Sequence, residues 1–582
     1  MIKKILKYTK NLTLLSIGLV GIYLFNLFFM KPYSIDHFLG KELVIGLVDS
    51  PEAMTYIGIF DRFNWLTGHN SNLSIPTKDD RENSIEQYEH VIKTLYKYED
   101  SSLTEVQKNT KKIAIFDAEN NLKQVKEFPH HDYPLNQIGG IHLNTIEFLS
   151  DMHPIRNESE AEDFISRANL IKKVYEGVLA DLEEQASAGI FPPEFVYDHV
   201  IDQLSEFISY DYNEHPLYTQ FLRKVKELNV GEEKEKIFED QIKKAIDESV
   251  TPGFKILKDF MMRTKQYANK NHGIWSQPNG DEYYKLRIRS YTTTDYSPEE
   301  IHQMGLQEVD RISSRMREIL TELGYDKNKT VGELMNELNE NPEFLYEDTP
   351  DRKEIIVNDY TEMMHEAIKI MEDYFHTMPK SEVIVKAVPE YSEQTAAGGY
   401  YQPPAIDGSR PGVFYVNLYD IKQTPKYSMR TLTYHEATPG HHHQIAHSLE
   451  NEELTLYRRF GYFTSAFSEG WALYAERLAL EVGLAENPYD ELGILQAEIL
   501  RAVRLVVDTG MHYKRWTREE AMEYMKANTG MSDTEVRVEI ERYIVWPGQA
   551  LSYKVGMIKM LELRQKAMDE SVSYTHLTLP TN

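Results

Sequence analysis

The sequence contains no cysteine among its 582 residues. This absence excludes disulfides, cysteine nucleophiles, cysteine-ligated metal sites and a lipid-modified cysteine. Positive charge is also scarce, because 64 Lys and Arg stand against 92 Asp and Glu and give a net charge of −28. Such a chain is poorly suited to bind nucleic-acid phosphates, and it has no G-x-x-x-x-G-K-[ST] phosphate loop. The length allows one large domain or several smaller ones.

Charge is absent from one long stretch near the N-terminus. An apolar run from Leu12 to Met30 follows four lysines, Lys3, Lys4, Lys7 and Lys10. The run can cross a hydrocarbon core of about 30 Å, it exceeds the usual core of a signal peptide, and no A-x-A-like cleavage site follows it. We therefore expect residues 1–30 to form a signal anchor, with signal cleavage and secretion as the alternative. The basic flank places residues 31 onward outside the cytoplasm.

Helical periodicity dominates the middle of the chain. From about residue 155 to 380, apolar residues recur at spacings of three and four with charged residues between them. Strand-like patterns occupy 111–116, 381–388 and 412–418. We expect residues 31–130 to form an N-terminal region of the ectodomain. Residues 572–582 read as one translation frame of a sequencing-library adapter, so we expect them to be foreign and the natural C-terminus to be truncated.

A histidine-rich tract is the strongest chemical signal. Five of the chain's 20 histidines lie between His435 and His447, together with Glu436. Imidazole is a common zinc ligand, and in the H-E-x-x-H motif two histidines at i and i+4 bind zinc while the glutamate acts as general base. Here the i+4 position is Pro439, which should kink or bulge the helix.

The interruption leaves three candidates for the second histidine ligand. On an unbroken helix, His441 would point about 240° away from His435, whereas His442 would face correctly but lie about 10 Å further along. If Pro439-Gly440 bulges out as a two-residue insertion, His441 takes the second ligand position. We therefore favour His441 over His442 and His443. A solvated histidine loop is the alternative without a metal.

A catalytic zinc site needs a third protein ligand and one open position for water. A helix-like segment downstream, Ser468-Glu-Gly-Trp-Ala-Leu-Tyr-Ala-Glu476, carries two glutamates on one face. We assign Glu469 as the third ligand and Glu476 as the partner that fixes the tautomer of a ligand histidine. A surface salt bridge is the alternative for Glu476.

Several longer motifs accompany these residues: Asp407–Gly412, Phe414–Asn417, Thr433–His442, Ser468–Glu476, Val507–His512 and Pro547–Lys554. On these motifs the chain resembles the bacterial zincin-like proteins of domain-of-unknown-function family 885, and weaker similarity extends upstream to about residue 130. The resemblance implies a mainly α, large helical metallopeptidase fold over residues 131–571, with a small β-sheet beside the metal helix. This implied fold is similar to that of metallopeptidases of the thimet-oligopeptidase and angiotensin-converting-enzyme type. Zn²⁺ as cofactor and a peptide as substrate are implied with it.

Two downstream residues are candidates for stabilising a reaction oxyanion. Arg501, Arg504, Asp508 and His512 recur at spacings of three and four. Asp508 could therefore pair with Arg504 and with His512, and it would favour the imidazolium form of His512. A solvated stripe of ion pairs is the alternative. Enzymes of the resembled type use a late tyrosine for this role, and Tyr553 fits it, with a core tyrosine as the alternative. By the same resemblance, the strand at 413–418 would pair with extended substrate, and a plain structural strand is the alternative.

These observations predict a membrane-anchored, extracytoplasmic zinc metallopeptidase. His435, His441 and Glu469 would hold the ion, and Glu436 would act as general base. One alternative is a non-catalytic relative of the same fold that binds metal or peptide. Another is a serine hydrolase using Ser468, because Ala466-Phe-Ser-Glu-Gly470 is a near match to G-x-S-x-G.

Overall fold

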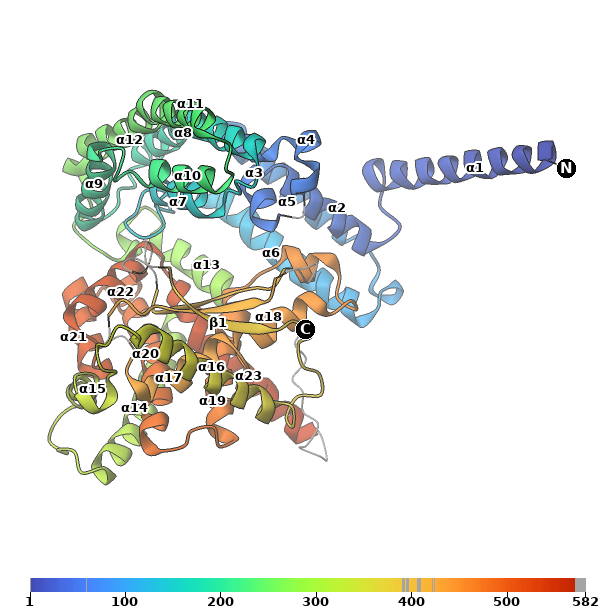
Figure 1. Ribbon diagram of the computed structural model, residues 1–582. Coiled ribbons are helices and arrows are strands. Elements are labelled where there is room, and N and C mark those ends of the chain that lie inside the picture. The colour runs from blue at the N-terminus through green and yellow to red at the C-terminus, as the bar shows by residue number, and fades with distance from the viewer. Residues whose placement is uncertain are drawn as a thin grey trace. The chain divides into compact units, whose positions relative to one another are not determined.

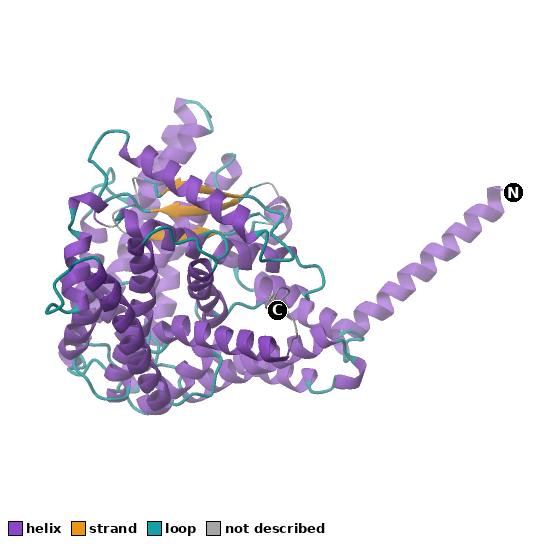
Figure 2. Ribbon diagram, turned by 90° about the horizontal axis from the view of Figure 1, so that it is seen from below, coloured by secondary structure: helices purple, strands orange, loops and turns teal. Residues whose placement is uncertain are grey.

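The computed structural model describes residues 2–58, 60–389, 393, 397–405, 410–420, 422 and 424–570. Within these residues the protein is mainly helical with one three-stranded sheet, which confirms the predicted fold class (Figures 1 and 2). The chain forms two compact units, Met1–Lys270 with Thr455–Tyr457, and Asn271–Leu454 with Arg458–Asn582. The boundary expected at residue 130 falls inside the first unit. Residues 406–409 and 572–582 lie outside the described ranges.

The first unit is built from helices. In chain order they are α1 (Ile2–Phe29), α2 (Ile35–Val48), α3 (Pro51–Ile57), α4 (Asn64–Thr67), α5 (Asp80–Leu95), α6 (Glu105–Glu127), α7 (Ile141–Glu147), α8 (Glu158–Ser187), α9 (Glu194–Ser209), α10 (Pro216–Glu227), α11 (Glu232–Ala245) and α12 (Thr251–Thr264). The strand predicted at 111–116 is wrong, because this segment lies inside α6. Thr110, Ala114 and Ala118 are buried at a spacing of four, which is a helical face.

α1 contains a stretch of membrane-spanning length. Thr9–Phe29 comprises 21 residues with a mean hydropathy of 2.1, and none of its most apolar window is buried. Among the described residues, it is the one helix long and apolar enough to cross a bilayer. The predicted apolar N-terminal segment is therefore an exposed helix of membrane-spanning length.

The second unit contains the sheet. β1 (Val383–Ala387) pairs in parallel with β3 (Gly412–Val416), and β2 (Gly399–Gln402) pairs antiparallel with the other edge of β3. The predicted strands at 381–388 and 412–418 are confirmed, whereas β2 was not predicted. β3 is the central strand, so both of its edges are already paired. The predicted strand addition of substrate to 413–418 is therefore wrong.

Helices surround this sheet (Figure 2). They are α13 (Gly280–Thr292), α14 (Pro298–Glu322), α15 (Val331–Asn339), α16 (Arg352–Met371), α17 (Lys426–Glu436), α18 (His441–Glu450), α19 (Ser465–Glu481), α20 (Pro488–His512), α21 (Arg518–Thr529), α22 (Asp533–Val545) and α23 (Ser552–Glu570). α17 contributes to two apolar cores. Its Met429 packs with Phe414 of the sheet, and its Tyr434 packs with Trp471 of α19. α17 is thus fixed against both the sheet and α19.

Candidate metal centre

A complete helix break brings His435 and His441 together. α17 ends at Glu436 and α18 begins at His441, so the chain turns at 437–440. The break is sharper than the predicted bulge within one helix. Gly440 approaches the end of α17 so closely that a Cβ would lie 1.9 Å from the carbonyl oxygen of His435. As a result the two imidazole rings meet edge to face, with centroids 4.8 Å apart.

α19 holds this turn in place from the other side. The indole Nε1 of Trp471 donates a hydrogen bond of 2.8 Å to the carbonyl oxygen of Pro439. The hydroxyl of Ser468 lies 3.4 Å from Nδ1 of His441. Sequence reasoning gave neither residue this role, although both stand in the quoted motif around Glu469. They show why that motif accompanies the histidine tract.

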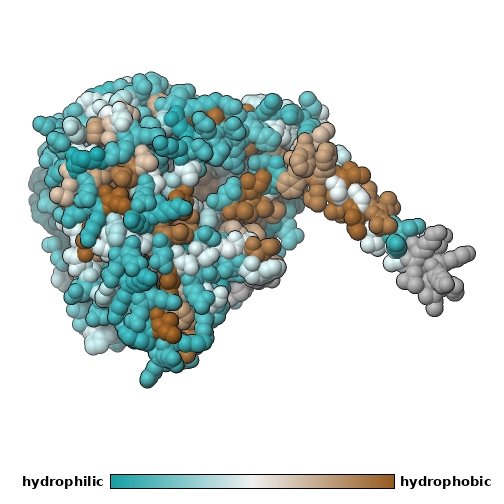
Figure 3. Space-filling model, turned by 90° about the horizontal axis from the view of Figure 1, so that it is seen from above, coloured by the Kyte–Doolittle hydropathy of each residue, from teal (hydrophilic) through white to brown (hydrophobic). Residues whose placement is uncertain are grey.

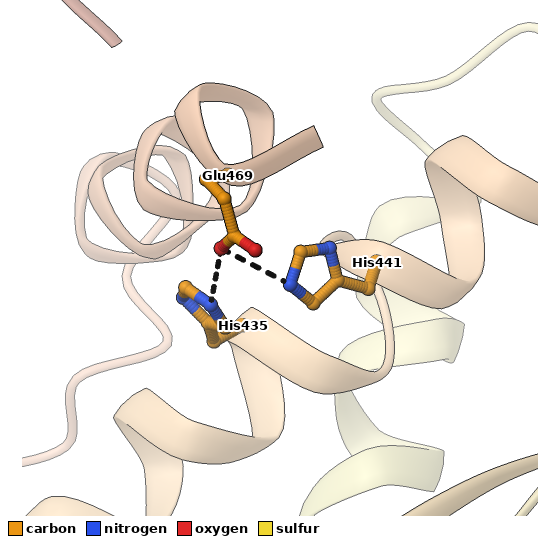
Figure 4. Close-up of side chains that lie close together, drawn as sticks. All are labelled: His435, His441 and Glu469. Carbon is orange, nitrogen blue, oxygen red and sulfur yellow. Dashed lines mark ion pairs between the residues drawn. The ribbon is translucent and has the colours of Figure 1, made fainter. Parts of the chain in front are cut away.

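Glu469 completes a cluster of three residues. Its Oε2 lies 3.6 Å from Nε2 of His435 and 3.5 Å from Nε2 of His441 (Figure 4). One donor atom from each residue lies within 4.8 Å of the other two. Two ligands bound tetrahedrally to zinc at 2.0–2.1 Å are separated by about 3.3 Å. The three side chains therefore fit a zinc ion after movements of only tenths of an ångström to about one ångström.

Opposite charges in the cluster hold one another in the ionised form. Burial alone would lower the pKa of His435, but hydrogen bonds and charge from Glu469 and Glu476 raise that pKa to about 9. Burial alone would raise the pKa of Glu469, but His435 and His441 hold it well below its usual range. The cluster thus carries carboxylate charge that a cation can neutralise.

Glu476 supports the first ligand from behind. Its Oε1 accepts a hydrogen bond of 2.6 Å from Nδ1 of His435, which leaves Nε2 directed toward Glu469. The Glu476 side chain is 2% exposed, so the alternative of a surface salt bridge is wrong. Its second oxygen has no hydrogen-bond partner among the described residues. This is the arrangement by which a carboxylate fixes the tautomer of a metal ligand.

Glu436 lies beside the cluster and is buried. Burial raises its pKa, and the neighbouring His441 and His435 offset part of that rise. Arg501 of α20 also lowers the pKa of Glu436 through its charge. Sequence reasoning had placed Arg501 only in a stripe of charged residues, and its proximity to Glu436 depends on the packing of α20 against α17.

His442 and His443 point away from the cluster. The Tyr401 hydroxyl donates to Nδ1 of His442 over 2.9 Å, and Nε2 of His442 donates to the Ser381 carbonyl oxygen over 3.1 Å. His443 packs against Phe375 with ring centroids 4.3 Å apart. Of the three candidates for the second ligand, His441 is therefore the one that the structure brings to His435 and Glu469.

The predicted charged form of His512 does not occur. Its Nδ1 accepts a hydrogen bond of 2.9 Å from the backbone N–H of Ile274, and its Nε2 donates to the Tyr543 carbonyl oxygen over 3.0 Å. Burial lowers the pKa of His512 to about 4. The expectation of an imidazolium facing an oxyanion is therefore wrong, because both ring nitrogens already bond to the backbone.

Asp508 and Arg504 also find partners outside their own helix. Asp508 accepts from the Tyr284 hydroxyl over 2.5 Å and from the Gly548 backbone N–H over 3.2 Å. Arg504 pairs with Glu539 over 3.0 Å. The predicted pairing of Asp508 with Arg504 and His512 is wrong. The stripe is buried rather than solvated, so neighbouring elements supply its partners.

Tyr553 and Ser468 lie on the two packed helices α23 and α19. Tyr553 is half-buried against the core around Trp471, and the Arg504 guanidinium lies 4.6 Å from its ring centroid. This contact agrees with a core tyrosine, while the oxyanion role of its hydroxyl stays a prediction. Ser468 lies buried within α19, which is not the strand–turn–helix setting of a G-x-S-x-G nucleophile.

The structure is that of a mainly helical protein in which two buried histidines and the half-buried Glu469 form a cluster that could hold a metal ion. A family model described as a bacterial protein of unknown function, DUF885, matches residues 51–574. The chain belongs to this bacterial DUF885 family, as the sequence motifs predicted. Its relationship to zincins stays a prediction.

Two solved structures resemble the chain over nearly its whole length. One is a protein of Colwellia psychrerythraea described as a candidate lipoprotein, with 34% identity, a TM-score of 0.83, and coverage of 92% of this chain and 94% of that chain. The other, from Shewanella oneidensis, is described as a candidate lipoprotein of unknown function. It has 16% identity, a TM-score of 0.70 and coverage of 93% and 94%, and shows the fold alone. No curated protein matches the chain.

Proposed function

We propose that the protein is a zinc-dependent metallopeptidase whose ion is held by His435, His441 and Glu469. The observation that carries this proposal is the convergence of two imidazole nitrogens and one carboxylate oxygen at 3.5–3.6 Å, with Glu476 on the far side of His435. Two nitrogens and one oxygen from three residues are a typical catalytic zinc set, which leaves a fourth position open for water or substrate.

Zinc, when bound there, supplies a Lewis acid that polarises a carbonyl group and lowers the pKa of water to about 7. The protein supplies the proton transfers. Glu436 lies next to His435 in the chain and is buried with a raised pKa. Such a carboxylate can take a proton from water and return it to the leaving amine. Glu476 keeps His435 in the tautomer that presents Nε2, and the hydroxyl of Tyr553 is proposed to donate to the oxyanion.

We further propose that α1 anchors the protein in the cytoplasmic membrane, with residues 31 onward outside the cytoplasm. The basic residues before the apolar stretch support this orientation. The two similar structures carry the description of lipoprotein, whereas this chain has no cysteine to take a lipid. An apolar helix would supply the attachment instead, and secretion after cleavage is the alternative. The substrates would then be extracytoplasmic peptides.

Hydrolysis of a peptide library, read by mass spectrometry, tests the proposed activity. The full chain loaded with zinc should cleave peptides, and Glu436→Gln should reduce cleavage by roughly 10²- to 10⁴-fold while zinc stays bound. Glu452→Gln is the matched control, because it makes the same chemical change at an exposed position. Bound zinc without cleavage of any peptide would instead identify a non-catalytic metal-binding relative.

A further inference from the structure

The segment that follows α1 exposes an unusual number of large apolar side chains. Seven of them lie between residues 33 and 66: Tyr33, Val44, Val48, Tyr56, Phe63, Trp65 and Leu66. The described residues from 67 to 270 expose only five, which are Tyr96, Met152, Ile237, Met262 and Tyr267, and the short segment 455–457 of the same unit adds Leu456. Trp65 is 81% exposed and Leu66 is 71% exposed. A dense apolar surface of this kind marks a contact with another phase or molecule.

α2 divides into a core half and an exposed half. Ile35, Phe38 and Leu39 are buried with Leu95 and Tyr98 in one apolar core. The half from Leu43 to Val48 contains no charged residue and no buried one. A surface helix of a water-soluble protein would place polar residues on its outer face. The exposed end of α2 is therefore adapted to an apolar or interfacial environment.

The junction between α1 and α2 is tied by hydrogen bonds. Asn26 is buried, its Nδ2 donates to the Lys31 carbonyl oxygen over 2.8 Å, and its Oδ1 accepts from the Tyr33 N–H over 2.9 Å. The Tyr98 hydroxyl donates to the Pro32 carbonyl oxygen over 2.8 Å. The end of the apolar helix is thus held against the body of the first unit and is not joined to it by a free linker.

We infer that Val44, Val48, Tyr56, Phe63, Trp65 and Leu66 form a juxtamembrane surface that lies in the headgroup–acyl boundary of the bilayer entered by α1. The inference rests on the membrane anchoring proposed above, and it is independent of the peptidase activity. Trp and Tyr favour this boundary, and apolar faces of interfacial helices enter it by about 5–10 Å. Figure 3 shows brown, hydrophobic surface along α1 and again where α1 joins the rest of the unit.

Continuity with α1 favours a bilayer over a protein partner. The hydrogen-bonded junction leaves only residues 30–34 between α1 and α2, so α2 begins beside the point where α1 leaves the membrane. α1 therefore keeps the first unit, which carries the juxtamembrane surface, close to the lipid without a separate binding event. A second copy of the chain is the competing occupant, and the experiment below distinguishes it.

The absence of cysteine makes the test direct, because single cysteines can be labelled with a nitroxide in the full chain. We would label Val48→Cys and Leu66→Cys in phosphatidylcholine nanodiscs, with Leu19→Cys inside α1 as the anchoring reference. Met262→Cys is the matched control, because Met262 is 58% exposed and Val48 is 53% exposed. Met262 belongs to α12, which lies at the end of the first unit away from α1 (Figure 1). Collision with oxygen and with a water-soluble nickel chelate is then measured by electron paramagnetic resonance.

For each label, the ratio of its collision rate with oxygen to its collision rate with the nickel chelate is compared. The inference predicts that this ratio at positions 48 and 66 is several-fold higher than at position 262 and approaches the ratio at position 19. If the label at position 19 collides as a label in lipid does, while the labels at positions 48 and 66 collide as the label at position 262 does, the surface proposal fails and membrane anchoring stands. If the label at 19 reads as aqueous, anchoring fails and takes the surface proposal with it. Labels at 48 and 66 shielded from both reagents, with dipolar coupling between chains, would assign the surface to a second copy and overturn the inference.

Discussion

Replacing Glu476 by glutamine should weaken zinc binding while leaving the three ligands in place. The carboxylate accepts a 2.6 Å hydrogen bond from His435, and the two side chains are 2% and 7% exposed. Glutamine keeps an acceptor oxygen of similar reach but removes the charge that favours a proton on Nδ1. Loss of such a partner typically lowers metal affinity 10- to 100-fold, which is about 1.4–2.7 kcal/mol. The short bond and the burial place the expected loss in the upper half of this range.

Competition with a fluorescent zinc chelator at neutral pH measures this change as a ratio of Kd values. Glu481→Gln, at the exposed end of the same helix, is the control for a general effect of removing one charge. Circular dichroism checks that both variants fold. If Glu476→Gln binds zinc as tightly as the wild type, the contact of Glu476 with His435 does not tune a metal site, and the reasoning from geometry fails.

Three further predictions concern stability. Burial raises the pKa of Asp508 to about 7, so its favourable contribution is full below about pH 4 and is lost as the pH rises through about 7. Asp508→Asn should not show this loss. In urea titrations, the free energy of unfolding of Asp508→Asn minus that of the wild type should therefore rise by up to roughly 4 kcal/mol between about pH 4 and pH 7. A difference that does not change with pH would contradict this. Gly556→Ala places a Cβ 2.1 Å from the Ala466 carbonyl oxygen and should destabilise the protein by about 1–3 kcal/mol or more, whereas an unchanged Tm would show that α19 and α23 are loosely packed. Lys554 is fully buried, and its Nζ lies 2.6 Å from a carboxylate oxygen of Glu498. Lys554→Met should therefore lower the free energy of unfolding by about 3–5 kcal/mol, because it leaves the Glu498 charge buried without this partner. Adding Glu498→Gln should recover part of that cost, and strict additivity of the two changes would refute the pairing.

Local geometry made much of the His–His–Glu cluster predictable. On an unbroken helix the rotation per residue would turn His441 away from His435, and the rise per residue would place His442 too far along the axis. Pro439-Gly440 indicated where the helix breaks, and the break brings His441 to His435. The seven-residue spacing of Glu469 and Glu476 placed both on one helix face, where the structure has them. These predictions succeeded because each depends on atoms within a few turns of one another.

Predictions that depended on distant partners failed. His512 and Asp508 have the spacing of an ion pair, but the backbone of Ile274 and the hydroxyl of Tyr284 supply their hydrogen bonds. Nothing in a spacing of four shows which elements will cover that helix face. The order of the strands could not be predicted for the same reason. β2 is a short segment that contains Gly and Tyr residues and pairs with the free edge of β3, so β3 becomes the central strand. Local sequence pattern does not encode which strand lies at an edge.

Zinc content by plasma mass spectrometry tests the central claim most directly. The full chain is compared with His441→Ala, Glu469→Ala and His442→Ala. The account predicts about one zinc per chain, lost with His441→Ala and Glu469→Ala but kept with His442→Ala, because His442 bonds to Tyr401 and Ser381 away from the cluster. A wild type without stoichiometric metal, or a loss with His442→Ala alone, would contradict it.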